Sequence, residues 1–233
     1  MALDDASLLK ATEQHVQQIL AGNDASHDYS HIERVRRTAL HLAALEGLDA
    51  RGQLVVQLGA LLHDISDHKY GGSNEQAQAA IQEFLSSQGQ PQDLIADVYA
   101  VVASVGFKEE LASKHGNSSS SSSSSSLSKE AAVVQDADRL DAIGAIGIAR
   151  CFTFGGAFKR VLHDPAVPPR LHLTKEQYMQ QGHQATTFNH FAEKLLKIKD
   201  LMKTASGRQL AQQRHAFMEH YLQQFVAEWE GKA

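Results

Sequence analysis

Apolar residues recur every three to four positions along most of the chain, which is the spacing typical of amphipathic helices. The first stripe consists of Leu8, Leu9, Val16, Ile19 and Leu20, and Gly22 follows it. Continued along the chain, this pattern predicts helices over 3–20, about 28–47, from 50 to the region of 63–64, 74–85, 91–105, from 128 to about 154, 186–202 and 207–229. The sequence therefore predicts an all-α fold.

Polar and small residues mark where these helices begin and end. Asp28 and Ser30 are both good N-caps for the second helix, which we expect to end near Gly47. Further along, Gly144 and Gly147 interrupt a helical pattern at a cost in stability, so they indicate close packing or a bend.

Two stretches lack the helical pattern. Nine consecutive serines, Ser118 to Ser126, form a low-complexity tract that cannot bury a core, so we expect a mobile loop inserted within one domain. Residues 159–181 contain three prolines and predict an irregular flap, with a short helix near Thr174. We therefore expect a single domain over 1–233, with a core at about 27–158 and a C-terminal helical pair at 184–230 packing on it.

Composition narrows the class of protein. With 233 residues and 42% hydrophobic residues, the chain can bury a sizeable core, and the low aromatic share favours helices over a β-sandwich. A net charge of −5 provides no basic field for nucleic acid or anionic lipid. The single cysteine, Cys151, fits a reducing compartment, and we find neither a signal-peptide region nor a membrane-spanning apolar run. We expect a cytoplasmic protein, monomeric or homodimeric, without nucleic-acid or membrane partners.

Candidate chemistry begins where the apolar run 54–62 meets His63 and Asp64. On a helix these two residues point about 100° apart and can reach one ion at their shared edge. Asp67 would lie on the same face one turn further on. An imidazole and a carboxylate on one ion, with a second carboxylate beside them, suit metal-assisted hydrolysis. A His-Asp pair alone is more often a surface or capping pair, so the interpretation depends on partners elsewhere.

His31 and Asp138 are those partners. Together with His63 and Asp64 they make a mixed nitrogen–oxygen ligand set, which suits Mn²⁺, Fe²⁺, Co²⁺, Ni²⁺ or Zn²⁺ better than Ca²⁺; Mg²⁺ also stays open. Four protein ligands on a six-coordinate ion leave two positions for water or a phosphate oxygen. Between Asp64 and Asp138 the only histidines are His68 and His115, so we expect one metal ion rather than two.

Four motifs together resemble the HD-domain superfamily of metal-dependent phosphohydrolases, and within it the YedJ/YpgQ-like branch. The motifs are HDYSHIERV at 27–35, LHDISD at 62–67, QDADRLDAIGAIGIAR at 135–150 and NHFAEKLL at 189–196. The resemblance implies an all-α fold, one divalent ion and hydrolysis of phosphate esters or anhydrides. Members of this branch look like nucleoside triphosphate pyrophosphohydrolases, which release a nucleoside monophosphate and pyrophosphate.

The resemblance places the last metal ligand at Asp138. Helix geometry then makes Asp141 a neighbour on the same face that could orient a ligand histidine or an arginine, and puts Asp136 on another side. We expect Asp67 to act as the general acid–base, because it lies just beyond the ligand pair.

Several basic side chains could bind the substrate's phosphates. The candidates are Arg34, Lys69, His27, His68, Arg139 and Arg150. The two histidines are as readily explained as capping or surface residues, and the last two arginines as surface ion pairs. Cys151 has no base evident beside it and fits a small buried residue better than a nucleophile.

Two alternatives to a pyrophosphohydrolase stay open. One is a nucleoside 5′-monophosphate phosphatase. The other is a nucleotide-binding protein that keeps the fold without turnover.

Overall fold

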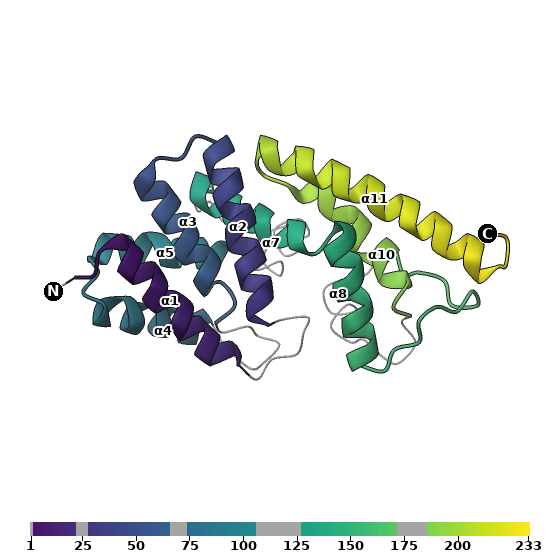
Figure 1. The fold of residues 1–233 in the computed structure, drawn as a ribbon, viewed down its shortest axis with the longest axis horizontal. Helices are drawn as coiled ribbons and strands as arrows, with labels where there is room; N and C mark the ends of the chain where they lie inside the picture. The colour runs from purple at the N-terminus through teal and green to yellow at the C-terminus, as the bar shows by residue number, and fades with distance from the viewer. Residues whose placement is uncertain (1, 22–27, 66–73, 106–126, 172–185) are drawn as a thin grey trace, which may run out of the picture. The chain divides into compact units, whose positions relative to one another are not determined.

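The computed structural model describes residues 2–21, 28–65, 74–105, 127–171 and 186–233 (Figure 1). Within these residues the regular structure is helical throughout, without a strand, so the all-α prediction is confirmed. The helices are α1 (Asp5–Leu20), α2 (Tyr29–Leu45), α3 (Ala50–Leu62), α4 (Asn74–Ser87), α5 (Gln92–Val105), α7 (Lys129–Asp141), α8 (Gly144–Ala157), α10 (Asn189–Glu193), the 3₁₀ helix η2 (Leu195–Leu201) and α11 (Ala205–Trp229). Internal contacts divide the chain into two compact units, 1–138 and 139–233.

Aspartates begin the first three helices of the first unit. The carboxylates of Asp4, Asp28 and Asp49 each accept a hydrogen bond from the backbone N–H three residues later. Each bond satisfies one of the N–H groups that a helix start leaves without an intrahelical partner. Of the two N-caps considered for α2, the structure selects Asp28.

Helix α3 is the core helix of the first unit. Nine of its 13 residues are buried, and it packs against α1, α2 and α5. Gly59 allows the closest approach, because an added Cβ would lie 2.6 Å from Cγ1 of Val101 on α5. Leu58, Leu61 and Leu62 are fully buried, and each stabilises the fold by roughly 1.5–3 kcal/mol. The residues that follow Leu62 therefore start from a rigid position.

Helix α7 brings its first ten residues into the same unit. Val133, Val134 and Ala137 are fully buried. Nε2 of Gln135 donates a 2.7 Å hydrogen bond to the carbonyl of Ser104 at the end of α5. This bond and the apolar contacts fix the rotation of α7, and hence the direction in which Asp138 points.

The helical pattern from residue 128 onward does not form one helix. It breaks after Asp141, and α8 begins at Gly144. Gly144 has a φ of +75°, and an added Cβ there would lie 2.9 Å from Cγ of Arg214. The Nη1 atom of Arg214 donates to the carbonyl of Leu140 in the last turn of α7, which also accepts from the backbone N–H of Ile143. The predicted bend is therefore confirmed at Gly144, as a complete break, and α8 runs past Phe154 to Ala157.

In the second unit α11 packs against α8 and η2, and α10 packs against η2. The prediction of one helix over 186–202 is wrong, because α10 has five residues and a 3₁₀ helix follows it. A cluster of rings links this unit internally: Phe225 of α11 stacks on Phe188 at 4.8 Å and on Trp229 at 6.0 Å between centroids. Aromatic pairs of this kind add about 0.5–1.5 kcal/mol to the burial of their surfaces.

Some expectations lie outside the described residues. They are the mobile loop at 118–126 and the short helix near Thr174. The single domain over 1–233 stays a prediction. No individual helix of the described part of the chain is long and apolar enough to cross a membrane; α7 and α8 pass that test only as a bent pair.

Candidate metal centre

His31 is held in the first turn of α2. Its backbone N–H donates to the cap residue Asp28, and its side chain is 2% exposed. The imidazole ring meets that of His63 edge to face, with 5.4 Å between centroids. The N-cap thus fixes the register that turns His31 into the interior rather than toward solvent.

His63 is the residue at which α3 ends. Its Nδ1 atom lies 2.8 Å from the carbonyl oxygen of Ala60, in the last turn of α3. A carbonyl accepts only, so Nδ1 carries the proton and donates it, which makes Nε2 the atom with the lone pair. The helix end thereby selects the tautomer. The sequence-based placement of His63 and Asp64 on the helix itself is wrong by one or two residues, because α3 stops at Leu62 and both lie in the following turn.

Four side chains point their ligand atoms at one small space. Nε2 of His31 lies 3.5 Å from a carboxylate oxygen of Asp64 and 3.5 Å from one of Asp138. Nε2 of His63 lies 3.6 Å and 3.9 Å from the same two carboxylates. Ligand atoms of His31, His63 and Asp64 all lie within 4.8 Å of one another. The structure therefore brings together all four residues expected to bind the ion.

This arrangement fits a divalent cation. Metal–ligand bonds of about 2.0–2.2 Å place neighbouring ligand atoms about 3.0–3.6 Å apart, close to the separations found here. In addition, Nε2 of His63 is buried and has no hydrogen-bond partner within the described residues. A buried lone pair facing two carboxylates is costly unless a cation or proton lies between them. The donor set of two imidazoles and two carboxylates could hold Mn²⁺, Fe²⁺, Co²⁺, Ni²⁺ or Zn²⁺.

The neighbouring carboxylates of α7 have different environments. Asp138 is 33% exposed at its side chain, whereas Asp136 is fully buried. Asp141 is also buried and forms an ion pair with Nη1 of Arg150 at 2.8 Å. Arg150 is thus a partner of Asp141, as one of the two expected roles requires.

The basic residues expected to bind phosphate also differ in their environments. Arg34 is half-buried on α2, three residues after His31 and so on the same helical face. Arg139 is 5% exposed, and its Nη1 atom donates to the carbonyl of Leu201 at 2.6 Å. Arg150 pairs with Asp141. Both Arg139 and Arg150 thus have structural partners inside the second unit.

Four other candidates, Asp67, Lys69, His27 and His68, lie outside the described residues. Cys151 is described: burial raises the pKa of its thiol to about 12. A thiol with that pKa is almost wholly protonated at neutral pH, which agrees with the expectation that Cys151 is not a nucleophile.

Sequence reasoning assigned no role to a group of side chains in the second unit around His163 and Asn189, although Asn189 begins the motif NHFAEKLL. His163 has a buried Nδ1 atom without a hydrogen-bond partner in the described part of the chain, and Asn189 is 4% exposed. A signal was present in three prolines followed by Phe188 and Phe191, but the prolines were interpreted as an irregular flap and the two aromatic residues as part of a helix over 186–202.

Comparison with known proteins defines the class. The sequence model of the HD domain family matches residues 28–143, which include all four residues of the candidate metal centre. The Bacillus subtilis protein YpgQ is 32% identical over 228 residues, covering 96% of each protein. The chain belongs to the HD domain family, which confirms the resemblance inferred from its motifs.

Two solved structures agree with this assignment. An HD-superfamily hydrolase from Bacillus thuringiensis is 33% identical, has a TM-score of 0.73, and is matched over 97% of this chain and 99% of that one. Bacillus subtilis YpgQ in complex with ADP is 29% identical, has a TM-score of 0.69, and is matched over 96% of each chain. The protein is therefore an HD-domain hydrolase of the metal-dependent phosphohydrolase class.

Proposed function

We propose that the protein hydrolyses nucleotides, and that its preferred reaction converts a nucleoside triphosphate to the monophosphate and pyrophosphate. The observation that carries the proposal is the convergence of His31, His63, Asp64 and Asp138 on one space, with Nε2 of His63 lacking a partner among the described residues. Such a site suits hydrolysis at phosphorus.

The four ligand residues have one task, which is to hold a divalent ion and leave positions open beside it. A divalent ion held by these four residues would supply electrophilic assistance at a phosphate oxygen and would make water more acidic. Asp67 acts as the proton acceptor or donor, because it follows the ligand pair by three residues in sequence. Arg34 binds a phosphate oxygen, because it shares a helical face with His31.

A nucleotide is the favoured substrate because the relative YpgQ has been solved in complex with ADP. The −5 charge of the whole chain does not oppose this choice, since local cations rather than net charge decide phosphate binding. The monophosphate phosphatase and the nucleotide-binding protein without turnover are the alternatives that an experiment must separate.

A product analysis tests the proposal. The purified protein is incubated with nucleoside triphosphates and monophosphates in the presence of Mn²⁺, Co²⁺, Ni²⁺ or Mg²⁺, and phosphate and pyrophosphate are separated. We expect pyrophosphate from triphosphates. Phosphate from monophosphates alone would favour the phosphatase, and binding without product under every metal would favour the protein without turnover.

Substitutions then test the residue roles. We expect Asp138→Ala to abolish metal retention and activity together, and Asp136→Asn to affect metal binding least. Asp67→Asn should keep the metal and lower kcat by about 10²–10⁴-fold, because the amide cannot accept a proton at neutral pH. Calorimetric metal titration decides: if Asp136→Asn loses the ion and Asp138→Ala keeps it, the ligand assignment is wrong.

A further inference from the structure

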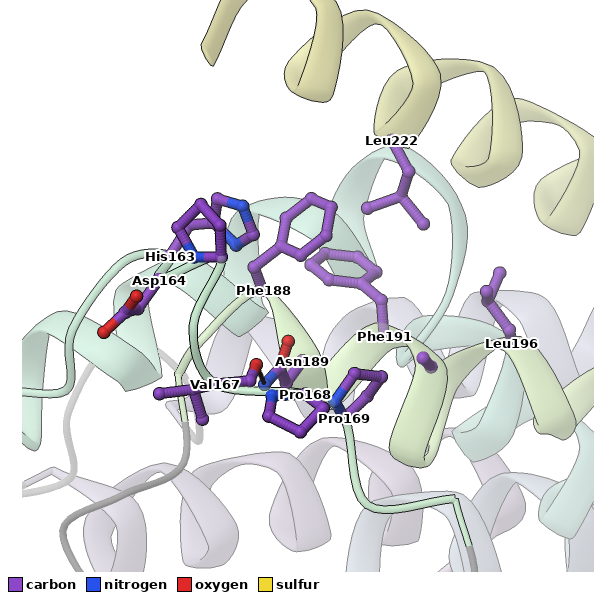
Figure 2. Close-up of a pocket in the computed structure, with 12 residues that line it drawn as sticks. His163, Asp164, Val167, Pro168, Pro169, Phe188, Asn189, Phe191, Leu196 and Leu222 are labelled. Atoms are coloured by element: carbon purple, nitrogen blue, oxygen red, sulfur yellow. Dashed lines mark hydrogen bonds between the residues drawn. The ribbon is translucent and has the colours of Figure 1, made fainter. Parts of the chain in front are cut away.

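A cavity of about 360 Å³ opens in the second unit, lined by residues between 163 and 222. Figure 2 shows the rings of Phe188 and Phe191 on one side, Pro168 and Pro169 on the other, and Asn189 between them. This volume is at the lower end of the range for small-molecule sites. We call the space between these two groups the slot; its aromatic and proline lining suits a flat ring, which can stack on it.

The walls of the slot are fixed before any ligand arrives. Phe191 is 1% exposed, and Phe188 stacks on Phe225 with a centroid distance of 4.8 Å and 28° between planes. The prolines opposite have restricted φ angles. Phe191 is too buried to offer a stacking face, so a planar ligand would stack on the half-buried, already ordered ring of Phe188 at little cost in side-chain entropy.

Two side-chain oxygens in the walls offer hydrogen-bond acceptors, and a third polar atom there is a histidine nitrogen. Nδ2 of Asn189 donates to the carbonyl of Val167 at 2.8 Å, which fixes the amide and leaves Oδ1 as an acceptor that this bond does not use. One carboxylate oxygen of Asp164 accepts from the backbone N–H of Ala166 at 2.9 Å, which leaves the other oxygen. Nδ1 of His163 is buried without a partner in the described residues.

The charge of the lining decides between ligand classes. Asp164 lines the pocket, whereas no lysine or arginine is among its lining residues in the described part of the chain. A phosphate group would therefore meet a carboxylate without a compensating cation inside the slot. A ligand that presents N–H groups along the edge of a flat ring satisfies both the acceptors and the walls.

We propose that this pocket binds a flat, amino-bearing heteroaromatic ring of the kind found in adenine, with any anionic substituent directed out of the slot. The ring has two sources, a free nucleoside or the base of a nucleotide. The inference concerns the second unit alone and does not depend on the metal centre or on turnover.

Binding is tested with the full chain in EDTA, so that a metal ion contributes nothing. The fluorescence of Trp229, the only tryptophan, reports on the site because its ring lies 4.9 Å from that of His163. We expect saturable binding of adenosine, and binding of purine riboside, which lacks the amino group, that is about 3–10-fold weaker, as the loss of one hydrogen bond implies. If adenosine binds more tightly than ADP, the ligand that carries the ring is a free nucleoside. If ADP binds more tightly and competes with adenosine, the ligand is a nucleotide. Absence of adenosine binding up to millimolar concentration, or equal affinity for purine riboside, overturns the proposal.

Variants locate the site. Ala192→Phe fills the slot from α10, and Ala149→Phe makes the same change at an exposed position on α8 outside the pocket. We expect the first to lose adenosine binding and the second to keep it. Should Ala192→Phe fail to fold, Leu222→Phe narrows the slot from α11, at a half-buried position. A folded, slot-filling variant that binds adenosine as well as the wild type does would overturn the assignment.

Discussion

The two nitrogens of His63 have different tasks. Nδ1 donates to the carbonyl of Ala60, and Nε2 faces the carboxylates of Asp64 and Asp138. The first contact fixes the tautomer and ring orientation that the second requires. A histidine at a helix end is therefore more useful here than one in mid-helix, because the helix end offers a carbonyl without an intrahelical partner.

We expect added Mn²⁺ to raise the melting temperature of the wild type and EDTA to reverse the change. At a metal concentration 100 times Kd, binding to the folded state alone stabilises by about 2.7 kcal/mol, or roughly 5–10 °C for a chain of this size. His63→Gln should abolish this shift because it removes the Nε2 ligand. His41→Gln, an exposed histidine of α2, is the control and should retain the shift. Thermal scans with and without Mn²⁺ decide, and an undiminished shift in His63→Gln would contradict the assignment.

His190 should make the protein sensitive to acid. Burial, and then the nearby charges of Lys194 and Arg160, lower its pKa from the ordinary 6.5 to about 4. Between pH 6.5 and about 4, His190 is protonated in the unfolded chain but stays neutral in the folded chain. The stability that His190 contributes is therefore complete above pH 6.5 and falls as the pH drops toward 4, by about 3 kcal/mol in total.

The variant His190→Gln isolates this contribution. Denaturant unfolding of wild type and variant is measured at pH 7 and at pH 4.5. Relative to its value at pH 7, the free energy of unfolding of the variant minus that of the wild type should be about 2–3 kcal/mol higher at pH 4.5. A difference that does not change with pH would show that His190 does not control acid stability.

At the scale of elements, Gly144 allows the break between α7 and α8. Gly144→Ala should destabilise the protein by about 1–3 kcal/mol, because the residue has a φ of +75° and its new Cβ would lie 2.9 Å from Cγ of Arg214. Gly156→Ala is the matched control: it lies within α8, and its Cβ would meet no atom within 4 Å. We expect the control to be neutral or stabilising by up to about 1 kcal/mol. Urea unfolding of both variants checks this, and equal effects would contradict the role given to Gly144.

Element boundaries could be predicted wherever local chemistry sets them. Asp28 caps α2 by its own carboxylate, and Gly47 has the positive φ of a helix end, so both boundaries follow from the sequence. The region 186–202 could not be predicted in this way. Phe191, Leu195 and Ile198 are spaced by three or four residues, which suits an α-helix and a 3₁₀ helix equally well, and packing against α11 decides between them.

In the candidate site, too, features set by local sequence could be predicted and features set by tertiary packing could not. The four proposed ligands were identified because motif residues of the HD family recur in this chain. The direction of the Arg139 side chain toward Leu201 could not be predicted, because the two residues lie 62 positions apart and meet only through tertiary packing. The pairing of Asp141 with Arg150 is intermediate, since nine residues separate them across the break at Gly144.

At the scale of the whole molecule, the serine tract should be dispensable. Replacing Ser118–Ser126 by a short Gly-Ser link should leave turnover and melting temperature near those of the wild type, because the tract has no apolar side chain to bury. Thermal scans and the pyrophosphate assay provide the measurement. A drop of more than about 5 °C, or about 1–2 kcal/mol, would show that the tract contributes to folding.

The bond between His63 and Ala60 joins the end of the core helix to the metal centre. If the last turn of α3 frays, Nδ1 loses its acceptor and the imidazole is free to rotate or change tautomer. An ion held by Nε2 therefore opposes fraying. Amide hydrogen exchange at Leu61 and Leu62, which are fully buried in the core, would slow when metal binds. Metal binding would thus be detectable as slower amide exchange in the hydrophobic core as well as by changes at the site itself.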